Sequence, residues 1–331
     1  MSFCKLSWLI CVGCVAQLYL VASEDIVEPT WLAAHLKDPN IKILDASYDL
    51  KPKPDWKEFK TKFFGKFDEL IKTHTNAAYT SEHIPGAIYY NIDIAYFPGE
   101  FEFFSLYPPD LYEQYIQKLG INQNDRIIVY SRNDNAGMLY SAFTWWTLKV
   151  YGHKNVQVLN GGFDAWKKVG NPTEKGAASA TAVGNWKAGP IDKSLVSTFD
   201  DMTHDPKGGN LFETNMTTIN MLDARPEEQF TGKTPLGFPA PKATGSHVAG
   251  AKNVPLKNVV GDEGVKDKSV LENALKSVNF DPSKPTVAMC NGGVQSSLLT
   301  LGLTRLEIKA RVYIGSMAEL AARASQYINS K

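Results

Sequence analysis

The chain is poor in cysteine. It has four cysteines in 331 residues, and three of them, Cys4, Cys11 and Cys14, lie close to the N-terminus. If that segment is removed as a leader peptide, Cys290 is the only cysteine left, and an internal disulfide is excluded. The Cys290 thiol is then either buried and inert, linked to another chain, or reactive.

The chain also has no excess of charge of either sign. Lys plus Arg equals Asp plus Glu at 35 each, and no dense run of Lys and Arg occurs. Binding to a phosphate backbone needs a basic face, so we expect no nucleic-acid partner. No His/Cys spacing typical of a metal site is present either, so we expect no metal.

The apolar run near the N-terminus is typical of a targeting segment. Lys5 precedes the apolar stretch LSWLICVGCVAQLYLV, which small and then acidic residues follow. This pattern predicts a secretory signal peptide over residues 1–23, and the stretch is shorter than the roughly 20 residues of a membrane-spanning helix. We therefore expect a secreted or secretory-pathway protein without stable membrane insertion. The triplet Asn215-Met216-Thr217 offers a possible N-glycan site at Asn215.

The two halves of the chain repeat one pattern. Each has a short apolar strand ending in Leu-Asp-Ala, then a turn of the form His-apolar-x-Gly-Ala at His83 or His247, then an apolar strand that enters a polar loop. A stretch with roughly helical apolar spacing follows each loop, at 137–150 and 297–306. Short strands alternating with helices predict α/β units with a parallel sheet.

The segment between the halves is small, polar and flanked by proline, which is typical of a linker. We predict two tandem α/β domains, each a small, mainly parallel sheet flanked by helices. The first spans residues 24–170, the linker 171–193, and the second 194–331.

Cys290 lies at a predicted strand-to-helix junction. A helix N-terminus carries partial positive charge, which favours the thiolate form of a cysteine beside it. Gly292 and Gly293 permit a close approach of the backbone. The alternative is a small buried cysteine in the core. A phosphatase loop is excluded because it needs an arginine six positions after the cysteine, where this chain has Ser296.

Six motifs in the same order resemble those of the two-domain sulfurtransferases of the rhodanese superfamily. The resemblance runs from about residue 27 to residue 322. The motifs are LDASYDL, HIPGAIYYNIDI, GGFDAWKKVGNP, LDAR, HVAGAKNVP and the loop that begins at Cys290.

The resemblance implies a sulfurtransferase in which only the second domain is active. Cys290 is its implied nucleophile, forming a persulfide with sulfur from a small donor, 3-mercaptopyruvate or thiosulfate. The acceptor is a thiol or cyanide, and no cofactor is implied. The implied active-site loop continues through Asn291, Gly292, Gly293, Val294, Gln295 and Ser296, and its N–H groups stabilise the charged sulfur.

Two side chains are implied as possible substrate contacts. His83 takes the place of a histidine that faces the cysteine in the family, although the matching His247 suggests that the turn itself requires histidine. Gln229 stands where the family usually has an arginine. Arg132, in the matching loop of the first domain, could supply charge to the site, but we predict a solvated surface side chain.

Several positions depart from the family pattern. Gly292 replaces the serine of mercaptopyruvate-type loops and the lysine of thiosulfate-type loops, and Phe143 replaces a second arginine. Each lost guanidinium forfeits a charge-assisted hydrogen bond of roughly 1.5–3 kcal/mol. A second hypothesis is therefore a secreted pseudoenzyme that keeps the fold as a binding module.

Overall fold

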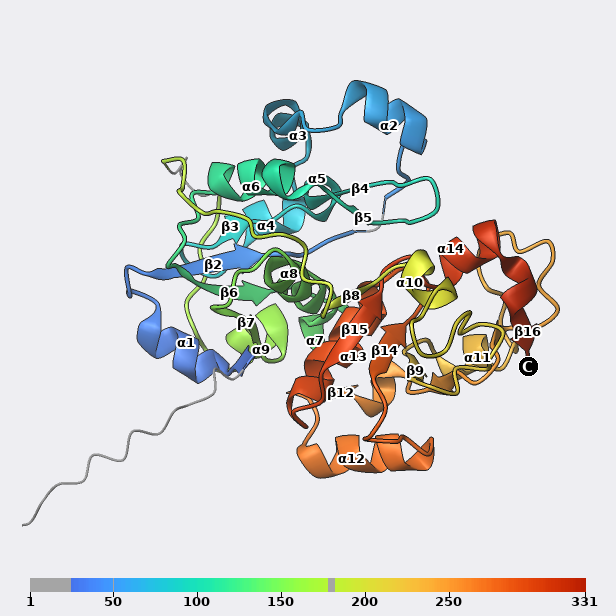
Figure 1. The fold of residues 1–331 in the computed structure, drawn as a ribbon. Helices are drawn as coiled ribbons and strands as arrows, with labels where there is room; N and C mark the ends of the chain where they lie inside the picture. Colours follow the sequence, from blue (N-terminus) through green and yellow to red (C-terminus); the bar gives the residue numbers. More distant parts are fainter. Residues whose placement is uncertain (1–24, 50, 178–181) are drawn as a thin grey trace, which may run out of the picture.

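Two sheets of five parallel strands each form the framework of the molecule (Figure 1). The structure is a computed structural model that describes residues 25–49, 51–177 and 182–331. The predicted signal peptide, residues 1–23, lies outside the described residues.

The two sheets have the same topology. The first has the order β1-β7-β6-β2-β3, and the second, from the equivalent edge, has the order β8-β15-β14-β9-β11. The first set is β1 (Ile26–Val27), β7 (Val156–Leu159), β6 (Arg126–Tyr130), β2 (Ile41–Asp45) and β3 (Ile88–Tyr89). The second set is β8 (Val196–Ser197), β15 (Ala310–Tyr313), β14 (Thr286–Met289), β9 (Asn220–Asp223) and β11 (Lys252–Asn253). The predicted α/β class with two tandem domains is confirmed.

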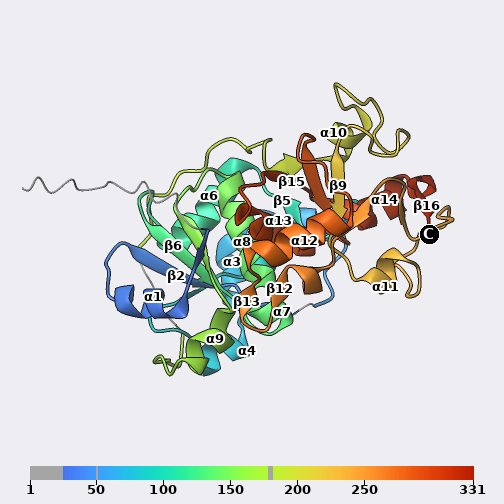
Figure 2. The same ribbon diagram turned by 90° about the horizontal axis from the view of Figure 1, so that it is seen from below.

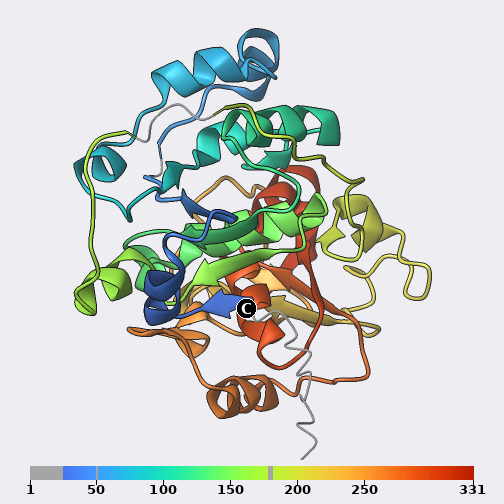
Figure 3. The same cartoon turned by 90° about the vertical axis from the view of Figure 1, so that its left-hand side faces the viewer.

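Helices cover both sheets. Those of the first domain are α1 (Pro29–His35), α2 (Trp56–Lys62), α3 (Phe67–Thr73), α4 (Ala77–Ser81), α5 (Ile92–Ala95), α6 (Pro109–Lys118), α7 (Asp134–Gly137), α8 (Leu139–Val150) and α9 (Gly162–Lys168). Those of the second are α10 (Phe199–Thr203), α11 (Glu227–Phe230), η1 (Leu256–Asn258), α12 (Lys268–Ser277), α13 (Val294–Thr304), α14 (Ser316–Arg323) and η2 (Ser325–Tyr327). Figure 3 shows α2 and α3 as an outer layer at one end of the molecule, with α12 at the other.

Each domain also carries a small hairpin beside its sheet. In the first domain β4 (Tyr96–Phe97) pairs antiparallel with β5 (Ser105–Leu106). In the second domain β12 (Val260–Gly261) pairs antiparallel with β13 (Gly264–Val265). A further antiparallel pair, β10 (His247–Val248) with β16 (Ile328–Ser330), lies near the C-terminus.

The central strands are apolar because they are covered on both faces. In β6, four of the five residues are buried, and all four residues of β14 are buried. Continuous burial of this kind is typical of parallel strands with helices on either side. The loops that follow these two strands therefore lie at equivalent edges of the two sheets.

The domains meet through the helices that follow these loops. α8 and α13 pack against each other in the middle of the molecule (Figures 1 and 2). Nearly every residue of both helices is buried, which explains why neither shows a polar face. A single hydrophobic cluster contains residues of both helices, including Trp146 and Leu298. The two domains are thus joined by a shared core.

The end of the predicted linker packs against the first domain. Trp186 is fully buried, and its indole N–H donates to Nδ1 of His153 at 2.9 Å. The Trp186 carbonyl accepts a hydrogen bond from Nε2 of Gln117 at 2.9 Å. This stretch of the predicted linker therefore has a fixed path along the first domain.

Buried ion pairs fix the strand ends in both repeats. Asp45 pairs with Arg132 at 2.9 Å, and Asp223 pairs with Arg225 at 2.6 Å. Arg132 is only 11% exposed and also stacks on Phe163, so the prediction of a solvated side chain is wrong. The reason is that the buried carboxylate of Asp45 needs a cationic partner, and its own repeat has no arginine two positions later.

Candidate active site

Cys290 directly follows β14 and precedes α13. Its backbone N–H donates to Oγ of Ser316 at 3.1 Å, and its carbonyl accepts from the N–H of Met317 at 3.1 Å. Both partners belong to the first turn of α14. The loop is therefore held from behind by a second helix.

The six backbone N–H groups from Asn291 to Ser296 have no protein acceptor. None of them donates a hydrogen bond within the part of the chain that the structure describes. Unpaired main-chain donors at a helix N-terminus are the usual binding groups for an anion. The turn after Cys290 can thus stabilise negative charge.

The matching loop of the first domain contains two internal main-chain hydrogen bonds. The N–H of Ser131 donates to the carbonyl of Gly137 at 3.2 Å, and the N–H of Gly137 donates to the carbonyl of Asn133 at 3.1 Å. The Ser131 hydroxyl also donates to the Gly137 carbonyl, at 2.7 Å. The N–H groups of residues 132–136 also have no acceptor among the described residues. The two loops therefore differ in the cysteine, which the first-domain loop lacks, and not in the presence of free main-chain donors.

The Cys290 side chain is 1% exposed and lies at the edge of the shared hydrophobic core. The hydroxyl oxygen of Ser296 lies 3.6 Å from Sγ of Cys290 and 2.9 Å from the carbonyl oxygen of Gly293, so its single proton can be donated to either. The sulfur is therefore buried between packed hydrocarbon and a hydroxyl donor. Any reagent that reaches it has to pass a covering group.

Gly293 shapes the turn. Its φ of 89° lies in the left-handed region, and it immediately precedes Val294, the first residue of α13. A Cβ atom on Gly293 would lie 2.7 Å from Cδ1 and 3.1 Å from the carbonyl oxygen of Ile314, so a side chain there would be strained and would require Ile314 to shift. Val294 packs inward with 9% of its surface exposed, while Gln295 is half-buried.

The structure brings Gln229 to the loop. It lies on α11, and its Oε1 accepts a hydrogen bond from Nδ2 of Asn291 at 3.1 Å. The other amide atom of Asn291, Oδ1, is buried without a partner among the described residues. These two amides form one wall of the site, in place of the guanidinium expected there in the family.

The structure gives His83 a place within the first domain. Its Nδ1 lies 2.8 Å from the carbonyl of Tyr79, and its Nε2 lies 3.1 Å from Oε1 of Glu174. His247 is bound similarly, with Nδ1 2.8 Å from the carbonyl of Phe230. Both ring nitrogens of His83 are occupied, which favours the hypothesis that the turn requires histidine for its own hydrogen bonds.

Phe143 lies in the apolar interior. It is fully buried and stacks on Tyr96 with a centroid distance of 4.4 Å and on Trp146 at 5.9 Å. At this position, where the family often has an arginine, Phe143 thus makes apolar contacts within the core. No group of three or more His, Cys, Asp or Glu side chains in the described residues is arranged to hold a metal ion.

Phe103 is a residue of this site that the sequence did not reveal. It lies between β4 and β5 of the first domain, and a Cβ atom on Gly292 would be 2.8 Å from its Cδ2. The contact joins positions far apart in the chain, and no local motif marks it. In the sequence, only the glycine at position 292 is related to this contact, because a residue without a side chain leaves room for the Phe103 ring.

Comparison with known proteins identifies the family. A model of the rhodanese-like domain matches residues 28–169 and 210–323. The chain belongs to the rhodanese family.

Relatives of known name cover nearly the whole chain. The 3-mercaptopyruvate sulfurtransferase of Escherichia coli strain K12 is 28% identical over 298 residues, 89% of this chain and 94% of that protein. The thiosulfate sulfurtransferase of Rattus norvegicus is 27% identical over 318 residues, 93% of this chain and 95% of that protein. A Caenorhabditis elegans protein, mpst-1, provisionally named a thiosulfate sulfurtransferase, is 32% identical over 296 residues, 87% of this chain and 90% of that protein.

Solved structures agree in fold. The sulfur transferase subunit of yeast mitochondrial complex I has a TM-score of 0.73 at 28% identity, covering 93% of this chain and 99% of that one. The E. coli 3-mercaptopyruvate enzyme SseA has a TM-score of 0.69 at 24% identity, with 89% and 99% coverage. This rhodanese-family chain is therefore a sulfurtransferase of the mercaptopyruvate or thiosulfate type, and the binding-module hypothesis gains no support. Among the described residues, no helix combines the length and apolar character needed to cross a bilayer.

The geometry of Gly293 predicts that replacing it with alanine destabilises the protein more than the same change at another glycine. Gly293→Ala combines left-handed strain with a collision at Ile314, whereas Gly209→Ala has a φ of 64° but nothing within 4 Å of its new Cβ. Left-handed strain costs roughly 1–2 kcal/mol and overpacking roughly 1–3 kcal/mol more. Chemical denaturation should therefore show a larger loss of unfolding free energy for Gly293→Ala, by about 1 kcal/mol or more. Equal losses would contradict this description of the loop.

Proposed function

We propose that the protein transfers a sulfur atom from a small anionic donor to a thiophilic acceptor through a persulfide on Cys290. The observation that carries this proposal is the set of six N–H groups, without an acceptor among the described residues, that follows Cys290. A buried persulfide anion needs donors to replace its hydration, and main-chain amides supply them without a charged side chain.

In the first half-reaction the Cys290 thiolate attacks the transferable sulfur of the donor. With thiosulfate, the S–S bond breaks and sulfite leaves with the bonding electron pair. With 3-mercaptopyruvate, the C–S bond breaks and the pyruvate enolate leaves, which then takes up a proton. In both cases Cys290 ends as Cys–S–S⁻, and the N–H groups of the loop hold the terminal sulfur.

In the second half-reaction the acceptor attacks that outer sulfur. The S–S bond of the Cys290 persulfide breaks, and Cys290 returns to its thiolate form. Cyanide is converted to thiocyanate, and a thiolate acceptor is converted to a new persulfide. The two half-reactions use the same site in turn, which is the ping-pong pattern of covalent catalysis. Ser296, which donates to Sγ at 3.6 Å, is placed to stabilise the thiolate released at the end of each cycle.

Mass measurement of the intact protein tests the intermediate. After incubation with thiosulfate or 3-mercaptopyruvate and removal of excess donor, the protein should gain the mass of one sulfur atom. Cys290→Ser should show no gain, and cyanide should remove the gain from the wild-type protein. A matched change elsewhere in the loop, Gln295→Ala, should retain the sulfur. No gain with either donor would contradict the persulfide mechanism.

The amide wall predicts weak binding of an anionic donor. Gln229 offers a neutral amide in place of a guanidinium, and a charge-assisted hydrogen bond contributes roughly 1.5–3 kcal/mol. Gln229→Arg should therefore raise kcat/KM for thiosulfate or 3-mercaptopyruvate by about tenfold or more, mainly through KM.

Thr231→Arg is the control for Gln229→Arg. It adds the same charge at an exposed position two residues away, and it should leave kcat/KM nearly unchanged. A similar effect of both substitutions would mean that long-range charge, and not a bound carboxylate or thiosulfate, is responsible.

We further propose that the protein acts in the secretory pathway, on the basis of the leader-like residues 1–23 and the sequon at Asn215. Asn215 is exposed in the structure, as a glycan-bearing side chain has to be. On expression in secreting eukaryotic cells, the protein should appear in the medium, and peptide N-glycosidase should increase its electrophoretic mobility. Asn215→Gln should abolish that shift, and the exposed control Asn124→Gln should not. Retention in the cytosol would contradict the proposal.

A further inference from the structure

The first domain contacts the cysteine loop of the second with the tip of its β4–β5 hairpin, where Phe103 is 46% exposed. We call residues Pro98–Phe104 the hairpin tip. Figure 1 shows this hairpin extending from the first domain towards α14 and α10 of the second. At its end, Phe103 lies so close to Gly292 that a Cβ atom there would be 2.8 Å from Cδ2 and 3.5 Å from Cβ of the phenylalanine.

Ring contacts attach the hairpin tip to the second domain. Phe103 meets Phe238 edge-on at a centroid distance of 6.3 Å, and the guanidinium of Arg323 lies 5.0 Å from the ring of Phe101. Among the described residues, no hydrogen bond or ion pair links the hairpin tip to the second domain. Such contacts are individually weak, of the order of 1 kcal/mol.

Polar bonds hold the hairpin tip to its own domain and keep its shape. Nζ of Lys53 donates to the carbonyl of Phe103 at 3.2 Å and pairs with Asp93 at 3.5 Å. Within the hairpin, Ser105 donates to Glu102 at 2.6 Å, and the N–H of Gly99 donates to the Glu102 carbonyl at 2.9 Å. The hairpin tip is thus a shaped unit that belongs to the first domain and rests on the second.

The equivalent hairpin of the second domain makes polar contacts with the first domain. β12 and β13 lie against α7 of the first domain (Figure 2). The N–H of Val265 donates across the interface to Oδ1 of Asn160 at 3.1 Å, and Glu263 pairs with Lys168 at 3.3 Å. The hairpin over the loop without cysteine is therefore bonded in place, while the one over Cys290 is not.

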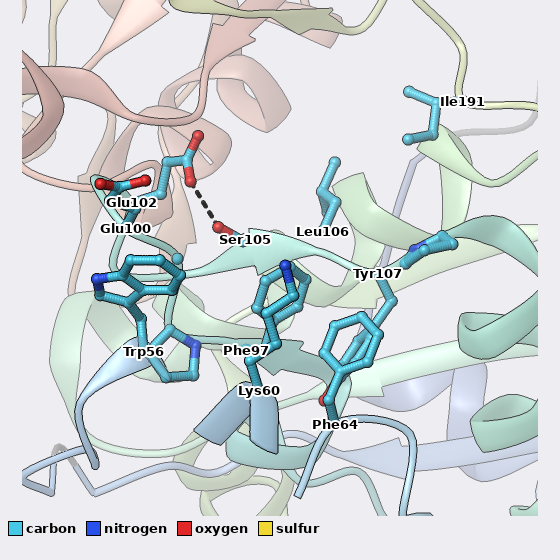
Figure 4. A pocket seen from close by; sticks show the side chains of 13 residues that line it. Trp56, Lys60, Phe64, Phe97, Glu100, Glu102, Ser105, Leu106, Tyr107 and Ile191 are labelled. Carbon is cyan, nitrogen blue, oxygen red and sulfur yellow. Dashed lines mark hydrogen bonds between the residues drawn. The ribbon is translucent and has the colours of Figure 1, made fainter. Parts of the chain in front are cut away.

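A hollow lies behind the hairpin, on the side of α2. It has a volume of about 500 Å³ and lies between the hairpin strands and a wall formed by Trp56, Lys60 and Phe64 (Figure 4). In Figure 1, α2 and the second domain are on opposite sides of this hairpin. The hairpin tip therefore has free volume on the side away from Gly292.

From these contacts we propose that Phe103 is a specificity-determining residue, supplied by the first domain, which selects by size the molecules that reach Cys290. The Phe103 ring occupies the space that a side chain at position 292 would take. Small donors and acceptors pass with little displacement of the hairpin tip, whereas bulky ones require it to move towards the hollow. A role of Phe103 in selecting the sulfur donor rests on the proposed sulfur transfer. Its control of access to the Cys290 thiol does not depend on that function.

Two thiol reagents of different size test the access. Methyl methanethiosulfonate is small, and 4,4′-dithiodipyridine is a neutral, bulky aromatic disulfide, whose reaction with the thiolate releases one absorbing thiopyridone. Phe103→Ala should raise the rate of Cys290 modification by the bulky reagent at least tenfold and that by the small one less than threefold. Cys290→Ser gives the background, and Val270→Ala, an exposed apolar residue on α12, is the control.

A second variant tests the contact itself. Gly292→Ala should displace the ring and raise the rate for the bulky reagent in the wild-type background, but have little further effect on Phe103→Ala. Equal rates in wild type and Phe103→Ala, or an equal increase for both reagents, would overturn the proposal. Neither reagent requires catalysis, so a failure of the persulfide assay alone would contradict sulfur transfer and leave the control of access standing.

Discussion

The active-site turn depends on the cost of leaving main-chain N–H groups unpaired. The turn between Cys290 and α13 presents six such groups, from Asn291 to Ser296, beside a sulfur atom. A bound anion or solvent has to satisfy these donors, because an unpaired buried donor costs roughly 1–3 kcal/mol. The scaffold stabilises this turn through Ser316 and Met317 behind it and through Gly293, whose left-handed φ a larger residue would adopt only with strain. The unpaired N–H groups raise the free energy of the turn when no anion is bound. For the same reason, they stabilise a negatively charged sulfur on Cys290.

The repeated fold shows how one scaffold serves two purposes. Both domains place a loop between a central strand and a buried helix, and each receives a hairpin from the other domain. In the first domain the loop is bonded internally at Ser131 and Gly137, and the β12–β13 hairpin is bonded to Asn160, which follows β7. In the second domain the loop carries Cys290, and the Phe103 ring of the hairpin tip lies against its Gly292. The first domain thus contributes packing through α8 and a cover through Phe103, while the chemistry belongs to the second.

The sequence predicted what depends on local patterns. Repeated strands ending in Leu-Asp-Ala led to two parallel sheets, and the Gly-rich turn after Cys290 led to a helix N-terminus beside a thiol. Contacts between distant segments were not predictable in this way. The Phe103–Gly292 contact joins the two domains, and the burial of Trp186 was hidden by the small residues around it. The predicted exposure of Arg132 was wrong because its partner Asp45 lies in another strand, far away in the sequence. The pair of His83 and His247 did favour a role within the turns, and the hydrogen bonds of both rings agree with that role.

The most direct test of the account is a comparison of amide resonances in ¹⁵N-labelled protein before and after sulfur loading. If the loop donors hold the terminal sulfur, the N–H protons of residues 291–296 should move downfield on loading, and those of the first-domain loop, residues 132–136, should not. Reversal on addition of cyanide should follow. Loading without change in the resonances of residues 291–296 would show that the charge is stabilised elsewhere and would contradict the account.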